Sequence, residues 1–168
     1  MAVKVRRLGR EIALGALYQV DVIGEDPAAA LPNARMLTLT ASDDADDGAP
    51  RKRRRRRAPP VPDPEQVEQA YEFACELVTR CLANIGELDA IIERYAQGWT
   101  LSRMASVDRN LLRLALTELL YFDDIPVSVS IDEAVDLAKQ YSTEESGKFV
   151  NGILGTYARE NGLVKAER

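Results

Sequence analysis

The chain has 168 residues, a formal net charge of −5 and no histidine. This length suits one domain with a hydrophobic core, and the acidic balance requires any affinity for nucleic acid to come from a local basic surface. The lack of histidine removes the usual general base and the commonest nitrogen ligand of zinc, so we expect neither a triad hydrolase nor a metal site. Hydrophobic residues make up 46% of the chain but aromatic residues only 6%, which favours packed helices over sheets.

The first predicted helix runs from Val5 to Ile23, because apolar residues recur there every three or four positions. Four cations avoid this apolar face: Lys4, Arg6, Arg7 and Arg10. Tyr18 lies further along the same polar side. Such an exposed surface suits RNA, since guanidinium groups bind phosphates and an unpaired base can stack on an aromatic ring. An ordinary solvated helix face is the alternative.

Residues 25–64 are rich in proline and contain an acidic group at 43–47 and seven adjacent cations at 51–57. This composition cannot bury enough apolar surface to offset the entropy of ordering, so we predict a disordered insertion in an otherwise single domain of residues 1–168. A short ordered piece around 35–40 is left open, although the pattern does not support it. We expect the cations to add a nonspecific RNA contact, with pairing to the preceding acidic group as the alternative.

Helical spacing resumes after Pro64, and it predicts helices over 67–82, 85–95 and 107–122. The first of these carries both cysteines, Cys75 and Cys81, on different faces, so we expect two reduced thiols. The third has almost no polar face, which is typical of a helix surrounded by others. It is therefore the predicted central helix of the core.

Two capping-box patterns mark the last predicted helices. Ser130–Glu133 precedes a periodic segment that reaches Tyr141, and Ser142–Glu145 precedes one that reaches Tyr157. Near the start of the last helix, Lys148 and Phe149 form a candidate second RNA contact, because free backbone N–H groups there attract anions. The alternative is a core phenylalanine beside a solvated lysine. Six to seven helices with short links predict an all-α fold, a compact bundle.

The usual sequence signals of secretion and of common enzymes are missing. No apolar run approaches about 20 residues, so we expect a cytoplasmic protein without a membrane span. Glycine-rich phosphate loops, serine-nucleophile motifs and Cys-x-x-Cys pairs are absent as well. We therefore expect no enzymatic activity and no cofactor.

Five blocks of sequence stand out when they are taken together. They are Arg6–Tyr18, Val107–Leu119, Asp124–Pro126, Ile131–Lys139 and Phe149–Leu154. In this order they resemble the NusB family of transcription antitermination factors, over residues 4–23 and about 66–160. The resemblance implies an all-helical fold of two small sub-bundles, with the first helix in the N-terminal one.

The resemblance also implies a function and a set of contacts. Members of the family bind the boxA element of nascent ribosomal RNA leaders together with NusE, a small-subunit ribosomal protein, on RNA polymerase. The implied RNA contacts are Arg6, Arg7 and Arg10 with Tyr18 beside them, and Lys148 and Phe149 next to Glu145. The implied NusE side falls on Asp108 and its neighbours. Phosphates would anchor on the arginines, and Phe149 becomes a candidate for base stacking.

The chain departs from the family pattern in two places. Leu8 and Gly9 interrupt the basic stretch, which predicts a weaker unaided affinity for RNA, and the insertion at 25–64 is longer and more charged than the usual connection. Two other functions stay open. One is a stand-alone RNA-binding module acting in ribosomal RNA processing, like the NusB-like domain of some RNA cytosine methyltransferases, and the other is a protein-interaction module. Homodimer formation is also left open.

Overall fold

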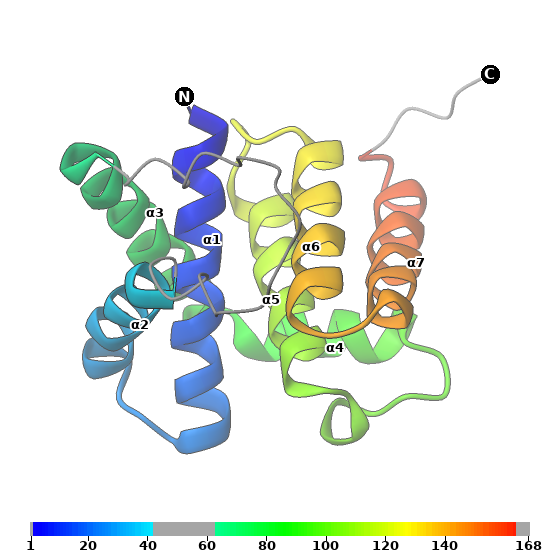
Figure 1. Ribbon diagram of the computed structural model, residues 1–168. Helices are drawn as coiled ribbons and strands as arrows, with labels where there is room; N and C mark the ends of the chain where they lie inside the picture. Colours follow the sequence, from blue (N-terminus) through cyan, green and yellow to red (C-terminus); the bar gives the residue numbers. More distant parts are fainter. Residues whose placement is uncertain (1, 42–62, 164–168) are drawn as a thin grey trace, which may run out of the picture.

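The computed structural model describes residues 2–41 and 63–163, and across these ranges the chain is all-helical (Figure 1). The α-helices are α1 (Ala2–Tyr18), α2 (Pro27–Ala41), α3 (Pro64–Ala83), α4 (Ile85–Tyr95), α5 (Ser106–Tyr121), α6 (Val127–Tyr141) and α7 (Glu144–Glu160). A π-helical segment, Gln19–Ile23, follows α1, and a 3-10 turn, Leu101–Arg103, precedes α5. The expected all-α bundle is confirmed.

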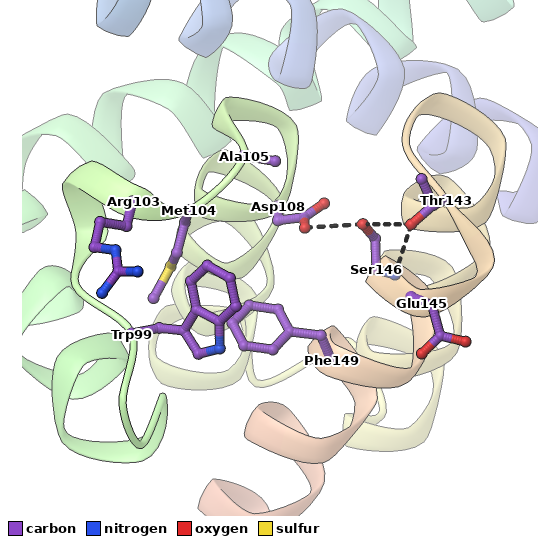
Figure 2. Close-up of a pocket in the computed structure, with 9 residues that line it drawn as sticks. All are labelled: Trp99, Arg103, Met104, Ala105, Asp108, Thr143, Glu145, Ser146 and Phe149. Atoms are coloured by element: carbon purple, nitrogen blue, oxygen red, sulfur yellow. Dashed lines mark hydrogen bonds between the residues drawn. The ribbon is translucent and has the colours of Figure 1, made fainter.

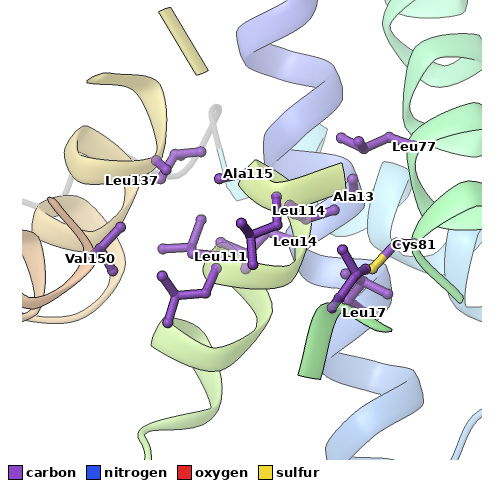
Figure 3. Packing of buried hydrophobic residues seen from close by; sticks show 14 of the residues in the cluster. Ala13, Leu14, Leu17, Leu77, Cys81, Leu111, Leu114, Ala115, Leu137 and Val150 are labelled. Carbon is purple, nitrogen blue, oxygen red and sulfur yellow. The ribbon is translucent and has the colours of Figure 1, made fainter. Parts of the chain in front are cut away.

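Helix α5 is the centre of the bundle, as its sequence predicts. It contacts α1 and α3 on one side and α4, α6 and α7 on the other, so it joins two groups of helices. Every residue from 110 to 118 is buried. Figure 3 shows Leu111 and Leu114 of α5 between Leu14 of α1 and Leu137 of α6. One continuous apolar core therefore runs through both groups.

The predicted disorder of residues 25–64 is wrong for the first part of that segment, because 27–41 form helix α2. The acidic group at 43–47 and the cations at 51–57 lie outside the described residues. The expectations for those two charged groups therefore stay predictions. The N-terminal boundary of the insertion moves to the end of α2.

Helix α2 forms because of a cap and a close contact rather than a strong apolar stripe. The Asp26 side chain accepts a hydrogen bond from the backbone of the first turn, and Pro27 suits the first helical position. Ala30 and Ala34 are buried. A Cβ at Gly15 of α1 would lie 3.3 Å from the Cβ of Ala34, so α1 and α2 pack closely through small residues. Small residues give a weak hydrophobic pattern, which explains why the periodicity missed this helix.

A buried ion pair joins α1 to α5 and α6. Arg10 is 4% exposed, and its Nε and Nη2 donate to the two Glu118 oxygens at 2.7 and 2.9 Å. The Ser130 hydroxyl donates to the same carboxylate at 2.7 Å. Glu133 lies 3.7 Å from the guanidinium. Each buried charge thus has its partner, which is the condition under which a protein interior tolerates it.

Both predicted capping boxes are corrected. Helix α6 begins at Val127, so Ser130 lies inside the helix, three residues after its start. The Ser130 hydroxyl donates to Glu118 inside the bundle and does not cap the helix. At α7 the cap is Thr143, whose Oγ1 accepts from the Ser146 N–H at 3.0 Å, one residue later than the predicted Ser142. Local sequence suggested the right regions but could not identify which hydroxyl had a distant partner.

The two cysteines do not pair with each other, as expected. Cys81 is buried in the core, and this burial raises the pKa of its thiol to about 11. Cys75 is half-buried. Within the described ranges, no helix is long and apolar enough to cross a membrane, and no cluster of His, Cys, Asp and Glu could hold a metal ion.

Gly9 is a contact point between α1 and α3. A Cβ at this position would lie 2.7 Å from the Ala70 backbone oxygen and 2.7 Å from Cδ1 of Phe73. Both distances are shorter than carbon contacts in proteins allow. The close packing of α1 against α3 therefore explains why a glycine interrupts the basic stretch.

Gly9→Ala is expected to lower the free energy of unfolding by about 1–3 kcal/mol, because the added methyl group overpacks this contact. The matched control is Gly152→Ala in α7, where an added Cβ meets nothing within 4 Å. The control should be neutral or should stabilise by up to about 1 kcal/mol. Urea unfolding followed by circular dichroism measures both, and equal effects would contradict the close approach of α1 and α3.

Glu118→Gln is expected to lower the free energy of unfolding by about 3–5 kcal/mol, because it leaves the Arg10 charge buried without its partner. Combining Glu118→Leu with Arg10→Met removes both charges and should recover most of that loss. Urea titrations of the two variants and the parent make the comparison. A loss below about 1 kcal/mol in Glu118→Gln, which is typical of exposed ion pairs, would show that the pair is solvated.

Candidate nucleic-acid interface

The first predicted RNA contact lies along the start of α1, on the side near α6. Lys4 is exposed, and the side chains of Arg6 and Arg7 are 34% and 25% exposed. Arg7 donates to Glu133 at 3.2 Å and to the Gln140 side chain at 2.8 Å, both on α6. The structure therefore gathers three cations at one edge of the bundle, and two of them are paired there with acidic or amide side chains.

Carboxylates share this basic edge. Burial acts to lower the pKa of Arg7, but the hydrogen bonds and charges of Glu133 and Glu11 raise it above its usual value. Arg6 donates to Asp124, and this hydrogen bond lowers the pKa of that exposed carboxyl. A phosphate must compete with these groups for the guanidinium donors. An anionic ligand at this edge would therefore replace carboxylates rather than fill a free cationic surface.

Two predicted members of this surface lie elsewhere. The expected exposure of Arg10 is wrong, because α5 places the Glu118 carboxylate against that side of α1 and buries the pair. Tyr18 is 40% exposed but stands eight residues beyond Arg10, about 12 Å along the helix. Tyr18 is therefore not beside the arginines. It belongs to the opposite end of α1.

Tyr18 lines a groove of about 920 Å³ between α1, α2 and the end of α6. Its apolar lining includes Leu14, Ile23, Met36, Leu37, Val107 and Tyr141. Ile23, Met36 and Leu37 are each more than half exposed. The sequence pattern predicts disorder rather than a helix at 27–41, so it gives no signal of this groove.

The turn that forms one end of this groove is fixed by charge. Asp21, in the π-helical segment, accepts from Arg109 Nε at 2.9 Å and from the Asn110 side chain at 3.0 Å. Burial acts to raise the pKa of Asp21, but the hydrogen bonds from Arg109 and Asn110 lower it overall. Arg113 lies 3.4 Å from the same carboxylate and is also paired with Asp89 at 2.7 Å. The end of α1 is thereby held against α5.

The second predicted RNA contact forms a pocket at the start of α7 (Figure 2). Phe149 faces Trp99 edge to face, with ring centroids 6.0 Å apart and an interplanar angle of 66°. The cavity measures about 480 Å³. Glu145 lines it, whereas the exposed Lys148 is paired with Glu145 at 2.8 Å and does not line it. Trp99 was missed by the sequence reasoning, although it is the single tryptophan of the chain.

Asp108 belongs to this same pocket. It is 7% exposed, and its Oδ2 accepts from the Ser146 hydroxyl at 2.9 Å. Asp108, which the family resemblance carries to the NusE side, and Phe149, which it carries to RNA, thus line one cavity. In Figure 1, helix α6 lies between α1, which carries the basic edge, and α7, which carries Phe149.

Comparison with known proteins identifies relatives for almost the whole chain. The family model described as NusB family matches residues 7–159. Transcription antitermination protein NusB of Symbiobacterium thermophilum is 42% identical over 154 residues, covering 92% of this chain and 89% of that protein. The protein of the same name from Myxococcus xanthus is 41% identical over 153 residues, covering 91% and 94%.

Solved structures agree with this result. T. maritima NusB superposes with a TM-score of 0.69 at 36% identity, covering 92% of this chain and 91% of that chain. A crystal structure of antitermination factors NusB and NusE in complex with dsRNA contains a chain that superposes with a TM-score of 0.69 at 28% identity, covering 94% and 98%. The matching blocks, the helical bundle and these relatives lead to one conclusion: the chain belongs to the NusB family.

Proposed function

We propose that this protein is an RNA-binding transcription antitermination factor. With NusE, it binds boxA-type elements of nascent ribosomal RNA in the cytoplasm and helps RNA polymerase to resist termination. The observation that carries the proposal is the likeness, over 94% of the chain, to a structure of NusB and NusE in complex with dsRNA. The proposed role is that of a binding protein, with no catalytic step and no cofactor.

The basic edge would anchor the RNA backbone. Lys4 is solvent-exposed, and Arg6 and Arg7 can turn their donors from carboxylates to phosphates at little cost, because they are only partly buried. Arg10 would act indirectly, since its guanidinium is turned inward onto Glu118. Phosphate contacts fix the position of the strand but carry no sequence information.

Sequence reading would take place at the pocket on the other side of α6. Phe149 and Trp99 offer aromatic faces for unpaired bases, and Lys148 lies at the neighbouring surface of α7. A strand that reaches both places has to cross α6, which lies between them. This separation suits a single-stranded RNA element of several nucleotides.

NusE would bind next to the pocket. Asp108 is too deeply buried to form a flat contact surface, but its neighbour Val107 lines the apolar groove that also contains Tyr18. Exposed apolar patches of this kind mark protein contacts. We assign the groove to the NusE side. A second copy of the chain on the same groove would account for homodimers.

Fluorescence anisotropy of a labelled boxA-like RNA against a scrambled RNA, with and without NusE, tests the proposal. NusE should strengthen binding of the boxA-like RNA only. Equal binding of both RNAs with no effect of NusE would instead indicate a general RNA-binding module. If the protein binds NusE but binds neither RNA, the result would indicate a protein-interaction module.

Arg6→Gln and Arg7→Gln are expected to weaken RNA binding about equally for both RNA sequences. Each should reduce the slope of log affinity against log salt by about 1 if the arginine contacts a phosphate. Arg94→Gln, at an exposed arginine on α4, removes the same charge away from this edge and serves as the control. Titrations at two or more salt concentrations measure the slopes. An unchanged slope in both variants would exclude the basic edge as the phosphate site.

A further inference from the structure

Arg7 lies where the basic edge meets the apolar groove. Its guanidinium donates from Nε to Glu11 at 3.3 Å, from Nη1 to Glu133 at 3.2 Å and from Nη2 to Gln140 at 2.8 Å. Glu11 and Gln140 also line the groove that contains Tyr18. One cation of the proposed RNA contact is therefore held by two side chains of the proposed NusE contact.

The two acceptors on the groove side can be reached by a partner. Gln140 is exposed, and the Glu11 side chain is 19% exposed. Burial raises the pKa of Glu11, although the hydrogen bond from Arg7 acts to lower it. The net rise means that Arg7 alone does not compensate this carboxylate for its lost hydration. A further N–H donor, brought by a protein in the groove, would be a favourable partner for it.

The surface around these acceptors is apolar. Tyr141 follows Gln140 at the end of α6 and is 47% exposed, and Leu14 lies about one turn beyond Glu11 on α1. Both line the groove. A protein seated on these side chains would exclude water from Glu11 and Gln140, so their oxygens would depend on protein donors. Each oxygen that accepts from the partner instead of Arg7 leaves one guanidinium donor available.

Glu133 has a different place in this arrangement. It lies 3.7 Å from the buried guanidinium of Arg10, and it is not among the residues that line the groove. A partner in the groove therefore has no access to it through that surface. Glu133 would keep Arg7 at the edge while Glu11 and Gln140 change their donors.

We propose that NusE in the groove takes over Glu11 and Gln140 as hydrogen-bond acceptors and thereby releases Arg7 to an RNA phosphate. This inference rests on the proposed function and adds the side chains through which one partner strengthens the binding of the other. The coupling is reciprocal, because RNA that draws Arg7 away leaves the same acceptors to NusE. Each ligand then raises the affinity for the other by the same factor.

Glu11→Gln keeps the shape of the side chain and removes the charge that holds Arg7. Without NusE, it should raise the affinity for the boxA-like RNA about two- to fivefold, the effect expected of a partly exposed ion pair. It should also reduce the enhancement by NusE by about the same factor, because part of the release has already occurred. Anisotropy of the labelled RNA, without NusE and at saturating NusE, measures both values in the full-length protein.

Three further measurements separate the release of Arg7 from a change in net charge. Glu72→Gln, at an exposed carboxylate of α3, removes the same charge elsewhere and should leave both values unchanged. Gln140→Ala removes an acceptor without altering the charge, and it should act in the same direction as Glu11→Gln. In an Arg7→Gln background, Glu11→Gln should no longer raise the affinity. Thermal melting by circular dichroism verifies folding, and Gln140→Ala decides alone if Glu11→Gln fails to fold.

The possible failures are distinguishable. Equal enhancement by NusE in the parent and in Glu11→Gln would overturn the coupling, leave the proposed function intact and indicate direct contacts between NusE and RNA. A gain in affinity that Glu72→Gln matches would reduce the effect to net charge and overturn it as well. Enhancement that follows the protein's own concentration, without NusE, would overturn it in favour of a second copy in the groove. Absence of any RNA binding, with or without NusE, would overturn both proposals.

Discussion

The buried pair of Arg10 and Glu118 is the interaction on which the arrangement of the other helices depends. It joins α1 to α5, and the Ser130 hydroxyl extends it to α6. Neither charge can stay in the interior without the other, so the rotation of α1 about its axis is restricted. That rotation leaves Arg6 and Arg7 at the edge beside α6, where a ligand can reach them. The basic edge is therefore a consequence of the buried pair.

The same principle acts at the other end of α1. Asp21 is held by Arg109 and Asn110 of α5, so the chain leaves α1 through a fixed turn rather than a loose one. Helix α2 then returns along α1 at a position where Gly15 allows close packing. These two contacts place the end of α1 and helix α2 where, with Tyr141 of α6, they line the apolar groove around Tyr18. An apolar groove is thereby formed in part by α2, whose apolar residues do not follow a strong helical stripe.

Helix α6 separates two different kinds of contact. At the edge, Arg6 and Arg7 are paired with carboxylates that a phosphate would have to replace, whereas the pocket at the start of α7 presents the aromatic side chains of Trp99 and Phe149. Binding strength and base selection would therefore depend on different residues. The net acidity of the chain is compatible with RNA binding, because only local groups would contact the strand.

Apolar periodicity was sufficient to predict α1, the buried α5 and the short connections, because these depend on spacing within a single helix. Five sequence blocks were sufficient to identify the family. Only the tertiary structure shows that the Arg10 side chain turns into the core and that residues 27–41 form a helix. It alone also shows that Asp108 and Phe149 line the same pocket. In each case the deciding partner is distant along the chain, and periodicity within a helix carries no information about which charge, small residue or hydroxyl the next helix will present.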